Sequence, residues 1–180
     1  MKRKFSPKVS LTFKNNHGYM NYNQYIEAIK LISSDILNKY GLKKIGILAL
    51  ARGALPMAAS ISHFTGIRDV SVMQLQMTNS DNCFDYGAVK LKNYYLYEYD
   101  AFILLEDVIY HGNTTNFAIN TLKALNKQIL EVYALAIDEN FIELPDNKDI
   151  KINYVYDIPS EDWLHFLWEE DITNKEKTYE

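Results

Sequence analysis

The sequence predicts an α/β protein built on a mostly parallel β-sheet that helices cover on both faces. Five short apolar runs are separated along the chain by segments with helical spacing or by turns. Runs that are almost continuously apolar are typical of strands buried on both sides in a parallel sheet. Ligands of open sheets of this kind bind beyond the carboxyl ends of the strands. Polar residues directly after an apolar run are therefore the first candidates for a functional site.

Each element follows from its local pattern. The first helix repeats apolar residues at helical spacing and ends at Gly41, whereas the second has Pro56 in its first turn, where proline is tolerated. In the third helix, five residues share one face: Phe117, Ala118, Thr121, Leu122 and Leu125. The predicted helices lie within 21–41, 51–64 and 113–125, and the predicted strands are 45–50, 70–77, 101–105, 129–137 and 151–158.

One long segment fits neither pattern. Residues 78–100 are polar and rich in tyrosine, and they have no helical period. We expect a long loop there, with room for a short hairpin only.

Composition and charge restrict the class of protein. With 180 residues, 48% hydrophobic and 23% charged, the chain is expected to form one globular domain over 1–180. The net charge of −4 argues against a broad nucleic-acid surface. A single cysteine, Cys83, excludes an intramolecular disulfide and fits a reducing compartment. No run approaches the roughly 18 apolar residues of a membrane span. We therefore expect a cytoplasmic protein with no membrane or nucleic-acid partner.

Two polar loops follow predicted strands and should meet at one edge of the sheet: "ALARGALP" at 49–56 and "EDVIYHGNTT" at 106–115. In the second loop, Glu106 and Asp107 are acceptors suited to ribose hydroxyls or to metal-bound water. The following turn has the features of a phosphate site, because Gly112 permits close backbone approach and the helix start offers free N–H groups. A phosphate next to vicinal hydroxyls suggests a ribose phosphate.

Other site motifs fail on spacing. The chain has no GxxxxGK[ST] motif, and no GxGxxG follows a strand. Its histidines and its cysteine do not have the spacing of metal ligands: His17, His63, Cys83, His111 and His165.

Three segments together resemble the type I phosphoribosyltransferases. The apolar strand, Glu-Asp pair and Gly-x-Thr turn are similar to the family's ribose-phosphate signature, and "LALARGALPMAASIS" is similar to its pyrophosphate loop. The segment "YVYDIPSEDWLHFLWEED" resembles the base-binding hood of bacterial xanthine-guanine phosphoribosyltransferases. The matches occur in family order over about 45–171. The resemblance implies a mostly parallel five-stranded core sheet flanked by helices. It places the domain core at about 20–140 and adds a small hood from the chain ends, whose C-terminal part is at about 153–172.

The resemblance also implies a role for each matching residue. Glu106 and Asp107 would hold the 2′ and 3′ hydroxyls of phosphoribosyl pyrophosphate and Mg²⁺. Arg52 and Gly53 would meet the pyrophosphate, next to a cis peptide at Ala51–Arg52. The 5′-phosphate would bind the turn formed by His111, Gly112, Asn113, Thr114 and Thr115. Trp163 would stack on the base, while the Leu164 backbone and the Glu169 carboxylate would read its edge. The loop 78–92 would close over the site.

Two positions depart from the pattern of 6-oxopurine enzymes. Tyr110 stands where the family usually has an aspartate near purine N7, and a phenol with a reference pKa near 10 is a poor base at neutral pH. His111, which replaces the usual threonine, has a better matched pKa. The family's lysine near the purine 6-oxo group has no counterpart near Ile137. The acceptor base is therefore left open.

The expected activity is transfer of a phosphoribosyl group to a purine or purine-like base, with release of pyrophosphate. The expected catalytic residues are Arg52, Glu106, Asp107 and Tyr110, and the resemblance implies a homodimer or homotetramer. The alternative is a non-catalytic regulator that keeps the fold and binds phosphoribosyl pyrophosphate or a nucleotide. Loss of the aspartate and the lysine favours the regulator, whereas retention of the carboxylate pair and the phosphate turn favours the enzyme.

Overall fold

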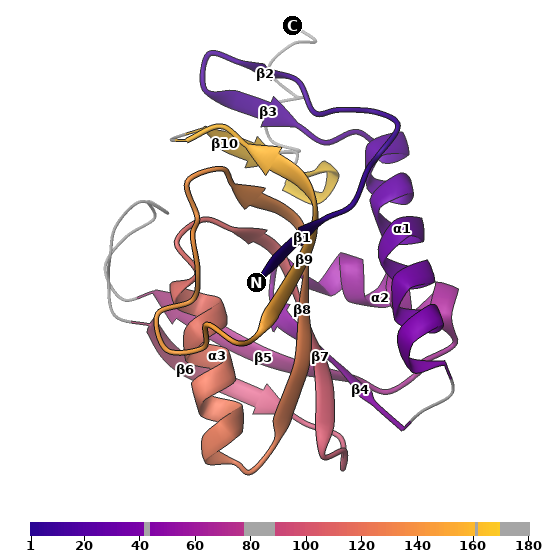
Figure 1. The fold of residues 1–180 in the computed structure, drawn as a ribbon, viewed down its shortest axis with the longest axis vertical. Coiled ribbons are helices and arrows are strands. Elements are labelled where there is room, and N and C mark those ends of the chain that lie inside the picture. The colour runs from indigo at the N-terminus through magenta and orange to yellow at the C-terminus, as the bar shows by residue number, and fades with distance from the viewer. Residues whose placement is uncertain (42–43, 78–88, 161, 170–180) are drawn as a thin grey trace, which may run out of the picture.

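The computed structural model describes residues 1–41, 44–77, 89–160 and 162–169. Its centre is a seven-stranded sheet in the order β1-β9-β8-β7-β4-β5-β6, in which only β6 runs antiparallel to its neighbour (Figure 1). The strands are β1 (Lys2–Lys4), β4 (Gly46–Ala51), β5 (Val70–Met77), β6 (Val89–Tyr95), β7 (Ala101–Ile109), β8 (Gln128–Asp138) and β9 (Lys151–Ile158). The prediction of a mostly parallel α/β fold is confirmed.

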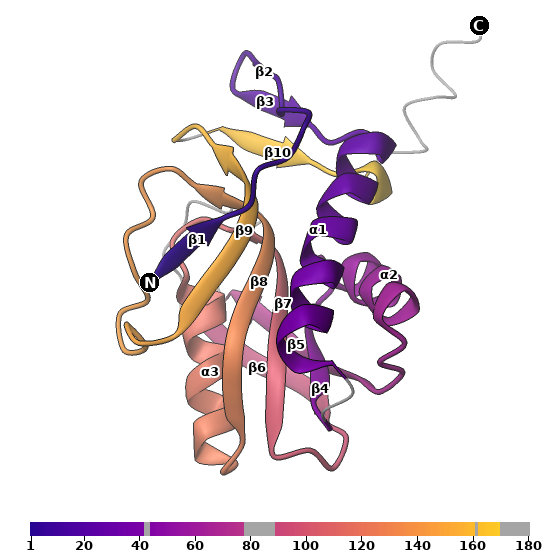
Figure 2. The ribbon, with the colours of Figure 1, turned by 45° about the vertical axis from the view of Figure 1, so that its right-hand side comes forward.

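Three helices cover the two faces of this sheet: α1 (Tyr22–Tyr40), α2 (Leu55–Thr65) and α3 (Asn113–Ala124). Helices α1 and α2 pack together on one face, and α3 lies on the other (Figure 2). Two hydrophobic clusters result, one on each side of the sheet. Helix α1 begins with a capping box in which Asn21 accepts from the Gln24 backbone N–H, and it ends before Gly41 as predicted.

A small hood lies over the carboxyl-terminal end of the large sheet (Figures 1 and 2). It contains a three-stranded sheet of β2 (Phe13–Lys14), β3 (His17–Tyr19) and β10 (Trp163–His165), followed by a 3₁₀ helix, η1 (Leu167–Glu169). Segments near the two ends of the sequence thus pair directly, since β10 is parallel to β3. The predicted hood from the chain ends is present in the described residues; residues 161 and 170–172 of its predicted range lie outside them.

The five predicted core strands are all present as β4, β5, β7, β8 and β9, and two further strands extend the sheet at its edges. Strand β1 is a Lys-Arg-Lys segment that pairs with β9, and its exposed side chains carry no hydrophobic pattern. Strand β6 lies in the segment expected to be mainly loop, and it forms an antiparallel pair with β5. Within the predicted loop 78–92, residues 78–88 are outside the described part of the chain, and so is Cys83.

Two further expectations need correction. The third core strand does not stop at Leu105 but continues to Ile109, because its pairing with β8 persists through Val108 and Ile109. The buried face of α3 is also rotated from the predicted one, since Leu125 is exposed and Phe117 only partly buried. The residues that α3 buries are Thr115, Ala118, Ile119 and Leu122.

Candidate active site

A pocket of about 590 Å³ opens where β4 and β7 end. Its walls come from the β4–α2 loop, the Glu-Asp pair of β7 and the 3₁₀ helix of the hood. The lining residues are Leu50, Ala51, Arg52, Gly53, Glu106, Asp107, Trp168 and Glu169. The two loops predicted to meet at one sheet edge therefore do so. Arg52 shares this pocket with three carboxylates, those of Glu106, Asp107 and Glu169.

Glu106 lies at the buried side of this pocket, with 7% of its surface exposed. The Thr115 hydroxyl donates a hydrogen bond of 3.0 Å to Glu106 Oε2, and the Thr114 hydroxyl lies 3.5 Å from the same oxygen. Burial, together with the charge of Asp107, raises the pKa of Glu106 well above its usual range despite these donors. The two threonines thus fix the carboxylate to the first turn of α3.

Asp107 is half-buried, and the β4–α2 loop presses directly against it. Burial raises the pKa of Asp107 to about 6, and the charge of Glu169 acts in the same direction, against lowering by backbone N–H groups. A Cβ added to Gly53 would lie 1.9 Å from Asp107 Oδ2. Only glycine therefore lets the loop and the carboxylate share this space, and the preceding peptide, Ala51–Arg52, is cis as expected.

The turn before α3 has the geometry expected of an anion site. Gly112 has φ of 75° and occupies the N-cap position, and no side chain caps the helix. A Cβ at this position would also approach Phe141 Cε2 to 2.7 Å and Leu144 Cδ2 to 2.9 Å. The loop after β8 therefore packs against this turn, and no described side chain caps the first N–H groups of α3, which suit an anion. His111 is exposed, while Asn113 and Thr114 are half-buried.

Tyr110 connects the phosphate turn to the hood. Its hydroxyl accepts a hydrogen bond of 3.3 Å from the Leu164 N–H, and its ring stacks on Trp163 with centroids 6.0 Å apart and planes inclined by 21°. Two of the three residues expected to contact a base, Trp163 and Leu164, are therefore engaged by the tyrosine that replaces the family's aspartate.

Trp168 also lines the pocket, although the resemblance assigns it no role. Its ring stacks on Phe166 at 4.6 Å and meets the edge of Tyr25 at 5.5 Å. Its Nε1 is buried without a hydrogen-bond partner among the described residues. The neighbouring Glu169 accepts from the Phe166 N–H at 3.1 Å, which holds its carboxylate at the pocket.

Solved structures with this architecture identify the fold. A purine phosphoribosyltransferase from Pyrococcus horikoshii aligns with a TM-score of 0.65 at 22% identity, over 87% of this chain and 95% of that one. The fold is that of a phosphoribosyltransferase. A xanthine-guanine-hypoxanthine phosphoribosyltransferase from Helicobacter pylori aligns with a TM-score of 0.67 at 14% identity, over 89% and 99%. A hypothetical protein from Neisseria gonorrhoeae with bound ppGpp aligns with a TM-score of 0.68 at 17% identity, over 93% and 97%. The sequence itself matches no family profile.

Within this phosphoribosyltransferase fold, the pocket brings five of the predicted residues together: Arg52, Gly53, Glu106 and Asp107 at the sheet edge, and Glu169 from the hood. Ile137 is almost fully buried opposite Ile109 in the sheet, and no lysine is among the described residues that line the pocket. The lysine that 6-oxopurine enzymes place near the purine 6-oxo group thus has no counterpart near Ile137 or in the described lining of the pocket.

The donor set at the pocket fits a magnesium ion only in part. Among the described residues, no group of three His, Cys, Asp or Glu side chains could hold a metal. Glu106 and Asp107 nevertheless supply carboxylates, and Mg²⁺ usually binds through one or two carboxylates together with water and substrate phosphates. The site therefore suits an ion that arrives with a phosphate-bearing ligand.

In the described part of the chain, none of the helices combines the length and the apolar character of a membrane span.

Proposed function

We propose that the protein transfers a 5-phosphoribosyl group from phosphoribosyl pyrophosphate to a purine or purine-like base and releases pyrophosphate. The observation that carries this proposal is the single pocket in which Glu106 and Asp107 face Arg52 and Gly53, beside an uncapped helix start. A ligand that satisfies all three features must combine a diol, a phosphate and a second anionic group. Phosphoribosyl pyrophosphate combines them in one molecule.

Each part of the site would act on a different part of this substrate. The carboxylates of Glu106 and Asp107 would accept hydrogen bonds from the ribose 2′ and 3′ hydroxyls and stabilise positive charge that develops at C1′ as the bond to pyrophosphate breaks. The turn from His111 to Thr115 would bind the 5′-phosphate through backbone N–H groups and the Thr114 hydroxyl. Arg52 would offset charge on the departing pyrophosphate. Mg²⁺ bound to the pyrophosphate would supply further charge neutralisation.

The base would enter beneath the hood. Trp163 offers an aromatic face, and stacking of this kind contributes about 1–3 kcal/mol in nucleic-acid complexes. Tyr110 must first give up its contacts with Trp163 and Leu164. Glu169 would then accept from N–H groups of the base. A homodimer or homotetramer in the cytoplasm remains part of this prediction.

A regulatory protein is the second candidate, and a specific observation favours it. The Tyr110 ring stacks on Trp163, and its hydroxyl accepts a hydrogen bond from the Leu164 N–H. A bound base would need both the Trp163 ring and the Leu164 N–H. The similar Neisseria gonorrhoeae protein has bound ppGpp. On this alternative, the pocket would bind phosphoribosyl pyrophosphate or a nucleotide as an effector without chemistry.

Pyrophosphate release distinguishes the two candidates. The protein is incubated with phosphoribosyl pyrophosphate and Mg²⁺, separately with guanine, xanthine, hypoxanthine, adenine and a 7-deazaguanine-type base. Release with one base that is lost in Asp107→Asn supports the transferase and names its substrate. Tight binding of the sugar phosphate or a nucleotide, without release for any base, supports the regulator.

A further inference from the structure

A second pocket lies on the other side of Arg52 and has the opposite electrostatic character. It measures about 630 Å³ and shares Ala51 and Arg52 with the carboxylate-lined pocket. Its other lining residues are Gln74, Leu75, Lys92 and Asn93. Two cationic and two amide side chains thus line it, and no carboxylate is among the described lining residues. The loop after β4 therefore separates a pocket lined by carboxylates from one whose described polar lining is cationic or amide.

Lys92 reaches this position because of an irregularity in β6. Along the β5–β6 pair, Gln74 lies opposite Asn93, but the next residue, Leu75, lies opposite Leu91. Lys92 is thus the extra, unopposed residue of a β-bulge. In a regular strand, successive side chains point to opposite faces, yet Lys92 and Asn93 both line one pocket. Bulges are known to re-aim side chains near active sites.

The two cations of this pocket are available to a ligand. Lys92 and Arg52 form no ion pair with a carboxylate in the part of the chain that the structure describes. By contrast, Lys39 is paired with Asp35 and Glu131 within the fold. A dense polyanion would therefore gain charge-assisted hydrogen bonds here without displacing an ion pair between described residues.

We infer that Lys92 binds the pyrophosphate group of the substrate and, after transfer, the pyrophosphate product. The inference rests on the proposed function for the identity of the substrate. Because Arg52 lines both pockets, the diol can lie on the carboxylate side while the diphosphate extends past Arg52 toward Lys92. The bulge thereby determines selection between ligands that carry a diphosphate at C1′ and ligands that carry only the 5′-phosphate.

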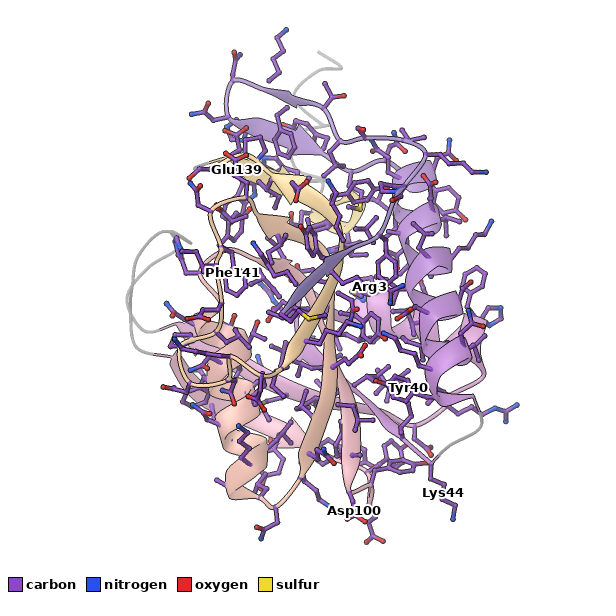
Figure 3. All side chains as sticks on the ribbon, in the orientation of Figure 1. Arg3, Tyr40, Lys44, Asp100, Glu139 and Phe141 are labelled. Atoms are coloured by element: carbon purple, nitrogen blue, oxygen red, sulfur yellow. The ribbon has the colours of Figure 1, made fainter. Side chains whose placement is uncertain are left out.

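Titration calorimetry with Mg²⁺ present tests the inference with three probes: phosphoribosyl pyrophosphate, inorganic pyrophosphate and ribose 5-phosphate. Lys92→Ala is expected to weaken the first two by about tenfold or more, the range of one hydrogen bond to a charged group. Affinity for ribose 5-phosphate and the melting temperature should stay at the wild-type values, and Lys92→Arg should recover part of the loss. Lys44→Ala is the matched control, since this exposed lysine lies at the opposite end of the molecule from the hood (Figure 3).

The outcomes separate this inference from the proposed function. Equal pyrophosphate affinity in wild type and Lys92→Ala, or no pyrophosphate binding at all, overturns the role of Lys92 and leaves it an ordinary edge-strand lysine. Pyrophosphate binding that depends on Lys92 supports the role even if phosphoribosyl pyrophosphate does not bind. Failure of phosphoribosyl pyrophosphate to bind would by itself reject the proposed transferase function.

Discussion

Replacing Asp107 by asparagine should make the ligand-free protein more stable while removing its affinity for phosphoribosyl pyrophosphate. The Asp107 carboxyl is half-buried next to Glu106 and Glu169, and its pKa is raised to about 6 from the 3.8 of a free aspartate. At 1.36 kcal/mol per pKa unit, ionising this group in the folded protein costs about 3 kcal/mol. Residual solvent contact reduces this value, so we expect a gain of about 1–3 kcal/mol, or several degrees in melting temperature.

The pH dependence of this gain has a definite sign. Because the pKa is higher in the folded than in the unfolded chain, the folded state holds the proton between pH 3.8 and about 6. Wild-type stability therefore falls as pH rises through this window. The advantage of Asp107→Asn should be absent below about pH 4, grow up to about pH 6 and then stay constant.

Thermal unfolding of both proteins from pH 4 to 8 measures this difference, with calorimetry of phosphoribosyl pyrophosphate binding at pH 8. Asp149→Asn is the matched control, because Asp149 is exposed outside the pocket and the substitution should change neither quantity. An Asp107→Asn protein that is less stable than wild type at pH 8 would refute the reasoning, since it would mean that the carboxylate is held by favourable interactions.

Three further substitutions test other parts of the site. Gly53→Ala should remove phosphoribosyl pyrophosphate binding in calorimetry, because the new Cβ would lie 1.9 Å from a carboxylate oxygen; wild-type affinity would show that the loop can move aside. Thr115→Val deletes the 3.0 Å hydrogen bond to Glu106 and should cost about 1–3 kcal/mol in urea unfolding, and no change would mean that the carboxyl is satisfied elsewhere. Trp163→Ala should weaken nucleotide binding by about tenfold or more without changing ribose 5-phosphate affinity, whereas Trp168→Ala should chiefly lower the melting temperature; the reverse pattern would make Trp168 the platform for the base.

The sequence was most informative where apolar pattern and chemistry agree. All five apolar runs form strands, and Glu106, Asp107, Arg52 and Gly53 meet at one pocket because parallel strands end at a common edge. Strand β1 was not predicted, because an exposed Lys-Arg-Lys segment at a sheet edge has no hydrophobic alternation. Such a strand is specified by the partner that it pairs with.

Contacts between side chains that are far apart in the sequence could not be predicted from it. The bulge at Lys92 depends on the register between two strands, which no local pattern encodes. The contacts of Tyr110 with Trp163 and Leu164 join residues more than fifty positions apart, so its departure from the family pattern was visible while its partner was not. The place of Trp168 was not predicted for the same reason, since only the fold brings it to the pocket that Arg52 lines.

The pairing of β3 with β10 and of β1 with β9 has a consequence for biosynthesis. A ribosome makes β1 and β3 long before their partners at 151–165. Strand β3 can pair with β2 at once, but β1 has no partner and β3 has no second neighbour until those residues are made. Contacts of such high sequence separation are slow to form. The roof of the binding site can therefore be completed only after residues 151–165 have been made. A nascent chain that ends at Asp138 already contains Glu106, Asp107 and the phosphate turn but lacks the segment that closes over a base.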